Sequence, residues 1–216
     1  MGARAGERVV VVSDRASDVR TTGIVVEPLT SKHLAGFAKL FESASSSCFC
    51  RYWHFTGTKN EWLDRCANRP EENLAEQREA LVRGDVSARG LVALEHGAVV
   101  GWMKLAPREA LPKLTSLPVY RQLAAEPGTW TIGCFVVDPK ARRRGIARAL
   151  VENAESYVAS QGGRAIEAHP RREAVPLHDE EAWQGPEQLF VGLGFTPIHD
   201  ASPYPVYRKV VARPTT

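Results

Sequence analysis

The apolar positions of residues 24–41 predict a strand followed by a helix. Residues 24–26 are a short β-branched run that ends before Pro28, which is typical of a strand. Thr30 or Ser31 then stands where a helix cap is expected, and apolar side chains follow at intervals of three and four residues: Leu34, Phe37, Leu40 and Phe41. We therefore expect the fold to begin near residue 24. A run at residues 9–12 is either an added edge strand or part of a trailing terminus.

In two longer stretches, residues 43–90 and 107–127, the apolar residues do not follow a single clear period. The first passes from a cluster of Ser, Cys and aromatic residues into charged sequence with spaced leucines, which predicts a loop and two helices. Residues 91–94 and 99–103 form the apolar arms of a hairpin, with Gly97 in its turn. The second stretch is broken by prolines and predicts irregular structure with one helical turn at residues 119–123.

The plainest unit is a strand, a basic loop and a long helix between residues 130 and 163. Residues 132–137 are mostly apolar and stop at Asp138-Pro139. The helix ends at Gly162-Gly163, and one apolar stripe follows its 3.6-residue period: Ile146, Leu150, Ala154, Tyr157 and Val158. Residues 165–168 then predict a strand, 187–193 a short helix, and 195–198 with 206–211 a final strand pair. The fold class is mixed α/β.

Composition narrows the class of protein further. A length of 216 residues suits one compact domain, and no apolar stretch approaches the roughly 20 residues of a membrane span or forms a secretory apolar core. The net charge of +3 is too small to indicate nucleic acid by itself. The four cysteines lack the density of a disulfide scaffold and the spacing of a zinc ribbon, so we expect free thiols and a cytoplasmic protein.

The basic loop is the first candidate for chemistry. Residues 138–148 contain five basic side chains and one acidic one, immediately before a helix. The first amides of a helix have no intrahelical acceptor and the helix dipole is positive there, so the loop is expected to bind a phosphate. Gly145 and Ala147 suit this because a large side chain would hold a pyrophosphate away from the amides. The loop matches neither the Walker pattern of nucleotide hydrolases nor the glycine pattern of dinucleotide folds.

This segment resembles the cofactor motif [RQ]-x-x-G-x-[GA] of the GNAT superfamily of acyl-CoA-dependent N-acetyltransferases. The matching residues are Arg142-Arg143-Arg144-Gly145-Ile146-Ala147. Residues 134–139 are similar to the strand before that motif, and residues 189–195 to the late aromatic-x-x-Leu-Gly-Phe segment. The resemblance spans residues 24–212 and implies one GNAT domain, with a central mixed, mostly antiparallel sheet of six to seven strands flanked by helices. Residues 1–23 would be an extension and 213–216 a tail.

The resemblance implies transfer of an acetyl group from acetyl-CoA to a primary amine of a small molecule or peptide, by direct attack in a ternary complex and without a metal. Main-chain groups near Val136 and Val137 would bind the pantetheine arm, and loop amides the pyrophosphate. A homodimer is also compatible with the family. The residues expected to bind the cofactor are Val136, Val137, Arg142, Arg143, Arg144, Gly145, Ile146, Ala147 and Arg148.

Two positions depart from the family pattern. Phe190 stands where the usual acid is a tyrosine, and Trp183 stands where many relatives have an asparagine. Because phenylalanine cannot donate a proton, a water, another side chain or no acid at all must serve. A catalytically weak acyl-CoA-binding sensor or scaffold is therefore the alternative function.

Glu167 is the candidate catalytic base. It ends the strand after the long helix, and in this fold neighbouring strand ends flank the thioester, where a carboxylate can be partly desolvated. The alternatives are a structural carboxylate paired with Arg171 or Arg172, or a side chain facing solvent. Weaker candidates for the base are His169 and Glu126.

Residues 47–54 occupy the place where the family builds the acceptor side of its cleft. Cys48, Tyr52 and Trp53 are the candidate acceptor-binding residues because ring faces can hold an amine, although such a cluster is also typical of a core. A Cys-x-Cys with a nearby Trp, and Ala-Pro-Arg at residues 106–108, resemble a bacterial subgroup of the family. Cys134 is expected only to pack. A zinc site would need an unusual spacing of its ligands: Cys48, Cys50, Cys66 and His54.

Macromolecular partners other than a peptide acceptor are not expected. Nucleic acid would use the arginines of the basic loop, but the sequence has no second basic stripe and no exposed aromatics interleaved with it. No membrane partner is expected either.

Overall fold

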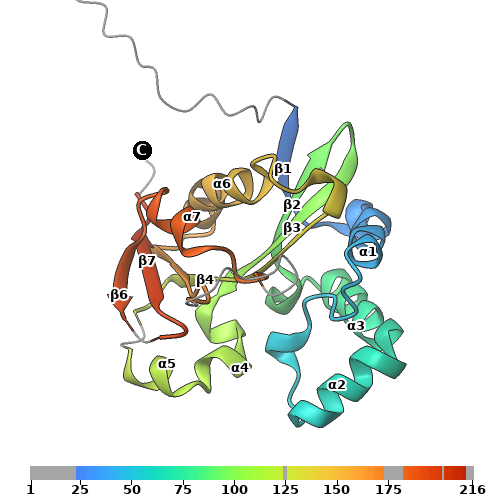
Figure 1. Ribbon diagram of the computed structural model, residues 1–216, viewed down its shortest axis with the longest axis horizontal. Helices are drawn as coiled ribbons and strands as arrows, with labels where there is room; N and C mark the ends of the chain where they lie inside the picture. The colour runs from blue at the N-terminus through green and yellow to red at the C-terminus, as the bar shows by residue number, and fades with distance from the viewer. Residues whose placement is uncertain (1–22, 124–125, 173–181, 201, 213–216) are drawn as a thin grey trace, which may run out of the picture.

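A seven-stranded sheet runs through the protein in the order β1-β2-β3-β4-β5-β7-β6 (Figure 1). The computed structural model describes residues 23–123, 126–172, 182–200 and 202–212. Neighbouring strands are antiparallel, except that β4 and β5 are parallel. This confirms the predicted mixed, mostly antiparallel sheet. The strands are β1 (Ile24–Pro28), β2 (Gly90–Glu95), β3 (Ala98–Pro107), β4 (Thr129–Val137), β5 (Ala165–Ala168), β6 (Thr196–His199) and β7 (Val206–Val210).

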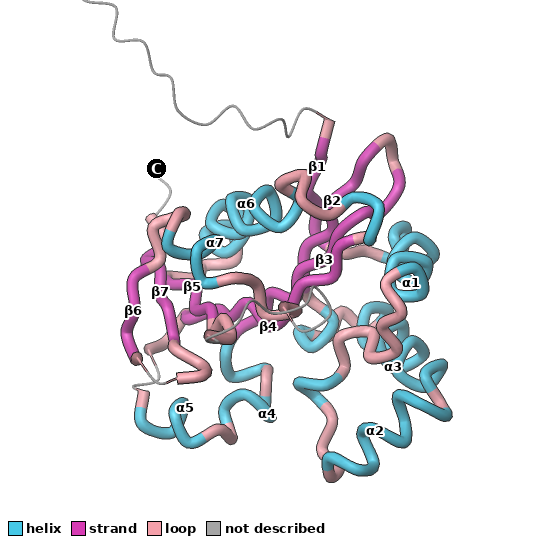
Figure 2. The backbone as a smooth tube through the Cα atoms, in the orientation of Figure 1, coloured by secondary structure: helices cyan, strands magenta, loops and turns pink. Residues whose placement is uncertain are grey.

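Helices cover both faces of the sheet (Figure 2). The helices α6 and α7 lie on one face, where Ile132 of β4, Ile166 of β5 and the apolar stripe of α6 form the main core. The helix α1 lies on the other face, where its residues Phe37 and Phe41 form a second core together with Trp102 of β3. The helices are α1 (Leu34–Ser43), α2 (Lys59–Asn68), α3 (Pro70–Val82), α4 (Pro112–Thr115), α5 (Pro118–Gln122), α6 (Ile146–Ser160) and α7 (Glu187–Val191).

The helix α6 lies very close to the middle of the sheet. A Cβ atom at Gly101 of β3 would come within 2.5 Å of Ile146 Cγ2, so only glycine permits this approach. The first turn of α6 is therefore held next to the end of β4.

The strands β4 and β5 separate after a short pairing. They pair only over Thr129–Thr131, whose partners run from Ala165 to Glu167, whereas β4 continues to Val137 alongside β3. Beyond Thr131, the β5 side of β4 is therefore available to other groups. This separation positions the candidate site.

Most predicted elements are confirmed, although the helix predicted at residues 187–193 ends at Val191. The main difference lies in the proline-rich stretch. That stretch holds two short helices, α4 and α5, each with a proline in its first turn, where the missing N–H costs nothing. The apolar run at residues 9–12 and the tail at 213–216 lie outside the described residues. Among the helices that the structure describes, none combines the length and the apolar character needed to cross a membrane.

Candidate active site

The basic loop makes a tight turn between β4 and α6. The Asp138 carboxylate accepts the Lys140 N–H at 2.9 Å, and Arg143 and Gly145 adopt positive φ angles of 61° and 81°. Gly145 is the N-cap of α6 and supplies no side chain to cap the helix. The first-turn amides of α6 therefore have no side-chain acceptor from their own cap, as an anion-binding helix start requires.

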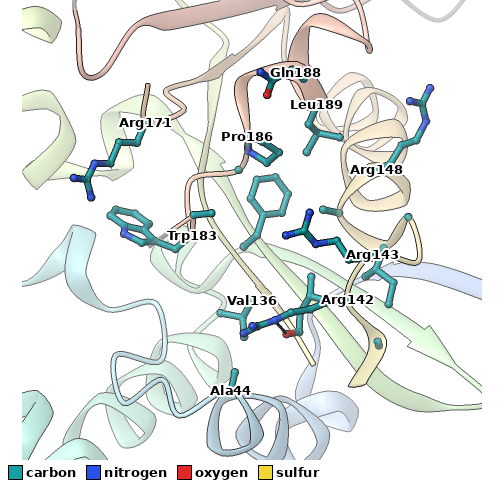
Figure 3. Close-up of a pocket in the computed structure, with 18 of the residues that line it drawn as sticks. Ala44, Val136, Arg142, Arg143, Arg148, Arg171, Trp183, Pro186, Gln188 and Leu189 are labelled. Carbon is teal, nitrogen blue, oxygen red and sulfur yellow. Dashed lines mark hydrogen bonds between the residues drawn. The ribbon is translucent and has the colours of Figure 1, made fainter. Parts of the chain in front are cut away.

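A cavity of about 820 Å³ lies beside this loop. Its walls come from the segment after α1, the end of β4, the loop and first turn of α6, the segment after β5, and the segment leading into α7. Figure 3 shows Arg142, Arg143 and Arg148 on one side of the cavity, with Arg171 and Trp183 on the other. The cavity therefore joins the predicted phosphate site to the gap between β4 and β5.

Eight of the nine residues expected to bind the cofactor line this cavity. Arg144 is the exception: its guanidinium forms an ion pair with Glu95 of β2, and Arg144 is not among the lining residues. The eight that line it are Val136, Val137, Arg142, Arg143, Gly145, Ile146, Ala147 and Arg148.

The described wall of the cavity is strongly cationic. Arg171 and Arg172 follow β5 and join the three loop arginines, whereas Glu187 is the only carboxylate in this wall. An excess of fixed positive charge in a concave site attracts anionic ligands such as phosphates. The sequence suggests Arg171 and Arg172 only as partners of Glu167 and does not indicate Glu187, because nothing in the local pattern marks these residues as part of this cavity.

The Glu187 carboxylate is held by two side chains from other elements. Arg172 Nε donates to Oε2 at 3.0 Å, and both Arg172 and the Tyr207 hydroxyl of β7 donate to Oε1. Arg172 also forms an ion pair with Asp200. Hydrogen bonds from Arg172 and then Tyr207 lower the pKa of Glu187 below its ordinary value, so this carboxylate is ionised at neutral pH.

Phe190 packs into the main core instead of the cavity. Its side chain is fully buried, with ring centroids 5.4 Å from Phe195 and 6.2 Å from Phe135, and it does not line the cavity. The position where the resemblance expects an acid tyrosine is thus an apolar packing position.

Glu167, the predicted base, is fully buried in β5. Its carboxylate accepts from Arg108 at 3.2 Å and from Arg208 at 2.7 Å, and it is not among the residues that line the cavity. The geometry favours the structural alternative, but with Arg108 and Arg208 as partners in place of Arg171 or Arg172. Glu126, a weaker candidate, pairs with the same Arg208.

The predicted acceptor aromatics meet the cavity through Trp183. The Trp183 ring lies 5.8 Å from Trp53 and 6.4 Å from Tyr52, centroid to centroid. Trp183 lines the cavity and is 36% exposed, whereas Trp53 is buried and neither it nor Tyr52 lines the cavity. Lys113 Nζ lies 4.8 Å from the Tyr52 ring centroid. The role of these rings toward an acceptor stays a prediction.

Two histidines near these rings are neutral because they are buried. Burial lowers the pKa of His54 to about 3 and that of His169 to about 4. The His169 ring lies 5.4 Å from Trp53 and has no hydrogen-bond partner among the described residues.

The prediction of four free thiols is wrong. Cys50 forms a disulfide with Cys134 of β4, whereas Cys48 and Cys66 are free. Cys134 faces the α1 side of the sheet, where the loop that carries Cys50 packs, and 84 residues of sequence separation conceal this contact. Cys50 is therefore not available to the zinc alternative, and among the described residues no group of three or more His, Cys, Asp or Glu could hold a metal ion. Four free thiols therefore no longer support the predicted cytoplasmic location.

Comparison with known proteins supports the fold described above. No curated protein matches the sequence. Among solved structures, a GNAT-family protein from Desulfovibrio desulfuricans is similar at 16% identity and a TM-score of 0.52, over 88% of this chain and 99% of that one. The PaiA N-acetyltransferase from Thermoplasma acidophilum, solved in complex with coenzyme A, is similar at 12% identity and a TM-score of 0.51, over 87% and 98%. At these identities the structures support the fold alone.

The family is established by sequence. Residues 51–182, more than half of the chain, match the model of the acetyltransferase (GNAT) family. The matched region contains the end of β4, the basic loop and α6, which form the cavity described above. The chain therefore belongs to the acetyltransferase (GNAT) family and is an acyl-CoA-dependent acetyltransferase.

Proposed function

We propose that this enzyme transfers the acetyl group of acetyl-CoA directly to a primary amine of a small molecule or peptide, within a ternary complex. The observation that carries the proposal is the shared cavity, which joins the first turn of α6 to the separated edge of β4. One end of this cavity is suited to phosphates and the other lies beside aromatic rings. A cofactor and an acceptor therefore have adjoining places.

The cofactor would bind mainly through backbone groups. The amides from Arg143 to Ala147 would hold the pyrophosphate, since Gly145 leaves them open and guanidinium groups surround them. Main-chain groups of Val136 and Val137 would hold the pantetheine arm where β5 has left β4. Bound acetyl-CoA would supply the thioester carbonyl that the amine attacks, and the chain would contribute chiefly by holding the two in line.

The acceptor would enter on the aromatic side. Trp183 at the cavity wall, with Tyr52 and Trp53 behind it, provides ring faces that suit an amine. Cys48 lies next to Ser46, which lines the cavity, with 3.4 Å between Ser46 Oγ and Cys48 Sγ. These contacts support the predicted role of Cys48, Tyr52 and Trp53 in acceptor binding. Membership of the subgroup with a Cys-x-Cys and a Trp stays a proposal from the sequence.

Three further properties are proposed from the sequence: the bounds of the domain, the cellular location and the oligomeric state. The domain would span residues 24–212, and the described elements run from Ile24 to Val210. A cytoplasmic location and a homodimer are proposals of the same kind.

The test begins with cofactor binding. The melting temperature is measured alone and with about a millimolar of acetyl-CoA, coenzyme A or ATP. A ligand at about a hundred times its Kd adds about 2.7 kcal/mol, a rise of several degrees for this chain length. A rise with both CoA species and not with ATP supports the cavity as their site. No rise with either CoA species contradicts the proposal.

Turnover is then measured with phenylethylamine, spermidine and a short peptide with a free N-terminus. Acetylated product is detected by mass spectrometry, because thiol reagents would also react with Cys48 and Cys66. Product with any of these amines supports N-acetyl transfer. Cofactor binding without product from any of them favours the sensor or scaffold alternative.

A further inference from the structure

Acetyl transfer from a thioester to an amine that is already in its neutral form relocates one proton. As the N–C bond forms and the C–S bond breaks, the nitrogen loses a proton and the departing thiolate gains one. The usual solution uses a base and a separate acid. Here the acid position holds Phe190, which is apolar and fully buried, so the described structure has no hydroxyl at that place.

Only one side chain in the described cavity wall can accept a proton near neutral pH. The ionisable side chains of this wall are those of five arginines and Glu187, and a guanidinium has no acceptor and stays protonated. The other polar side chains, Ser45, Ser46, Gln188 and Trp183, are not bases in this range. Glu187 is therefore the candidate proton acceptor, both because it is a carboxylate and because it lines the cavity.

The carboxylate of Glu187 is also fixed in position. Arg172, which follows β5, grips both of its oxygens, and Tyr207 of β7 donates its hydroxyl to Oε1. Arg172 also forms an ion pair with Asp200. Glu187 therefore remains an oriented proton acceptor instead of a flexible surface acid.

We infer that Glu187 carries the proton in both halves of the reaction: its carboxylate takes the proton from the attacking amine nitrogen and returns it to the sulfur of coenzyme A. No second acid is then needed, and protons balance because Glu187 ends as it began. Arg172 and Tyr207 are positioning residues, since they act through Glu187. This inference rests on the proposed function.

The first test is Glu187→Gln, assayed with whichever of the three amines is acetylated best. General acid–base catalysis contributes about 10²- to 10⁴-fold, so kcat/KM should fall by about a hundredfold or more. The acetyl-CoA-induced rise in melting temperature should persist. Glu155→Gln is the matched control, because Glu155 of α6 also forms an ion pair, with Lys209 of β7 at 2.7 Å, but does not line the cavity. The activity of this variant should be unchanged.

The second test is Tyr207→Phe, which keeps the ring and removes one donor to Glu187. Because that donor lowers the pKa of Glu187, its loss should raise this pKa. The acid limb that Glu187 contributes is read from kcat at saturating acetyl-CoA and amine, so that protonation of the free amine does not set it. This limb should move to higher pH in Tyr207→Phe and disappear in Glu187→Gln. A merely structural contact would leave the position of this limb unchanged.

Three results would overturn the inference. One is a Glu187→Gln enzyme that keeps its activity within about threefold, far less than general acid–base catalysis supplies. Another is an acid limb that stays in place in both variants. The third is a Glu187→Gln protein that loses acetyl-CoA binding together with activity, which would mark a structural role. A wild-type protein that binds acetyl-CoA and acetylates none of the amines would overturn the proposed amine transfer, and this inference with it.

Discussion

The backbone N–H of Phe135 donates to the carbonyl oxygen of Trp183 at 2.6 Å. This bond attaches the segment leading into α7 to the β5 side of β4, beyond the point where β5 has separated. Trp183 and Phe135 both line the cavity. The hydrogen bond therefore sets how the far wall of the site sits against the strand expected to bind the pantetheine arm.

The turn after Trp183 should be sensitive to a single methyl group. Gly185 has φ of +82°, and a Cβ there would lie 3.0 Å from the Phe135 ring and 3.2 Å from the Phe190 ring. Gly185→Ala should cost about 1–2 kcal/mol for the left-handed backbone alone, and more for the contacts. We expect a fall of several degrees in melting temperature and weaker acetyl-CoA binding.

Gly97→Ala is the control for that substitution. Gly97 has nearly the same φ, +80°, but no atom within 4 Å of its added Cβ. The Gly97→Ala protein should lose only the stability that the left-handed backbone costs, and it should bind acetyl-CoA normally. Equal effects of the two substitutions on binding would show that the Gly185 turn does not shape the cavity.

At the basic loop, backbone should matter more than side chain. Gly145→Val forces a bulky residue into φ of +81° and screens the first-turn amides, so the Kd for acetyl-CoA should rise at least about tenfold. Arg142→Ala removes one of several cations and should raise the Kd for acetyl-CoA only a few-fold. Isothermal titration with acetyl-CoA measures both, and equal losses would contradict backbone-dominated binding.

Glu167→Gln separates a structural carboxylate from a base. Loss of the charge removes the buried carboxylate that Arg108 and Arg208 share, and breaking a buried ion pair typically costs about 3–5 kcal/mol. Urea unfolding should show this loss, while acetyl-CoA still binds. Normal stability combined with a large fall in kcat would instead establish Glu167 as the base.

The disulfide can be tested by counting thiols. In denaturant without reductant, two of the four cysteines should react, since Cys50 and Cys134 are bonded to each other. Reduction should lower the free energy of unfolding by about 2–4 kcal/mol, because the bond closes a long loop in the unfolded chain. Cys66→Ser should respond to reductant as the wild type does, whereas Cys134→Ser should not respond.

Stability should fall on mild acidification. The pKa of His169 is lowered from 6.5 to about 4 in the folded protein, so below pH 6.5 the unfolded chain binds a proton that the folded one does not. The contribution of His169 to the free energy of unfolding is complete above pH 6.5 and is lost as the pH falls toward about 4. His169→Gln should flatten this part of the stability profile, and His96→Asn, in the exposed hairpin turn, should not.

Local sequence determined most elements and the position of the basic loop at one end of the cavity. The apolar stripe of α6, the hairpin turn at Gly97 and the loop before Ile146 each depend on residues within one or two turns of each other, and all appear where the sequence predicts them. Short-range periodicity and backbone preference are sufficient for such features.

Only the tertiary structure decided how distant side chains meet. The Cys50–Cys134 disulfide, the burial of Glu167 between Arg108 and Arg208, and the contacts of Glu187 all join segments far apart in the chain. Those contacts depend on which strand faces which, and on the point where β4 and β5 separate. Strand register and packing are set by the whole core at once, so the local pattern around each residue could not reveal its partner.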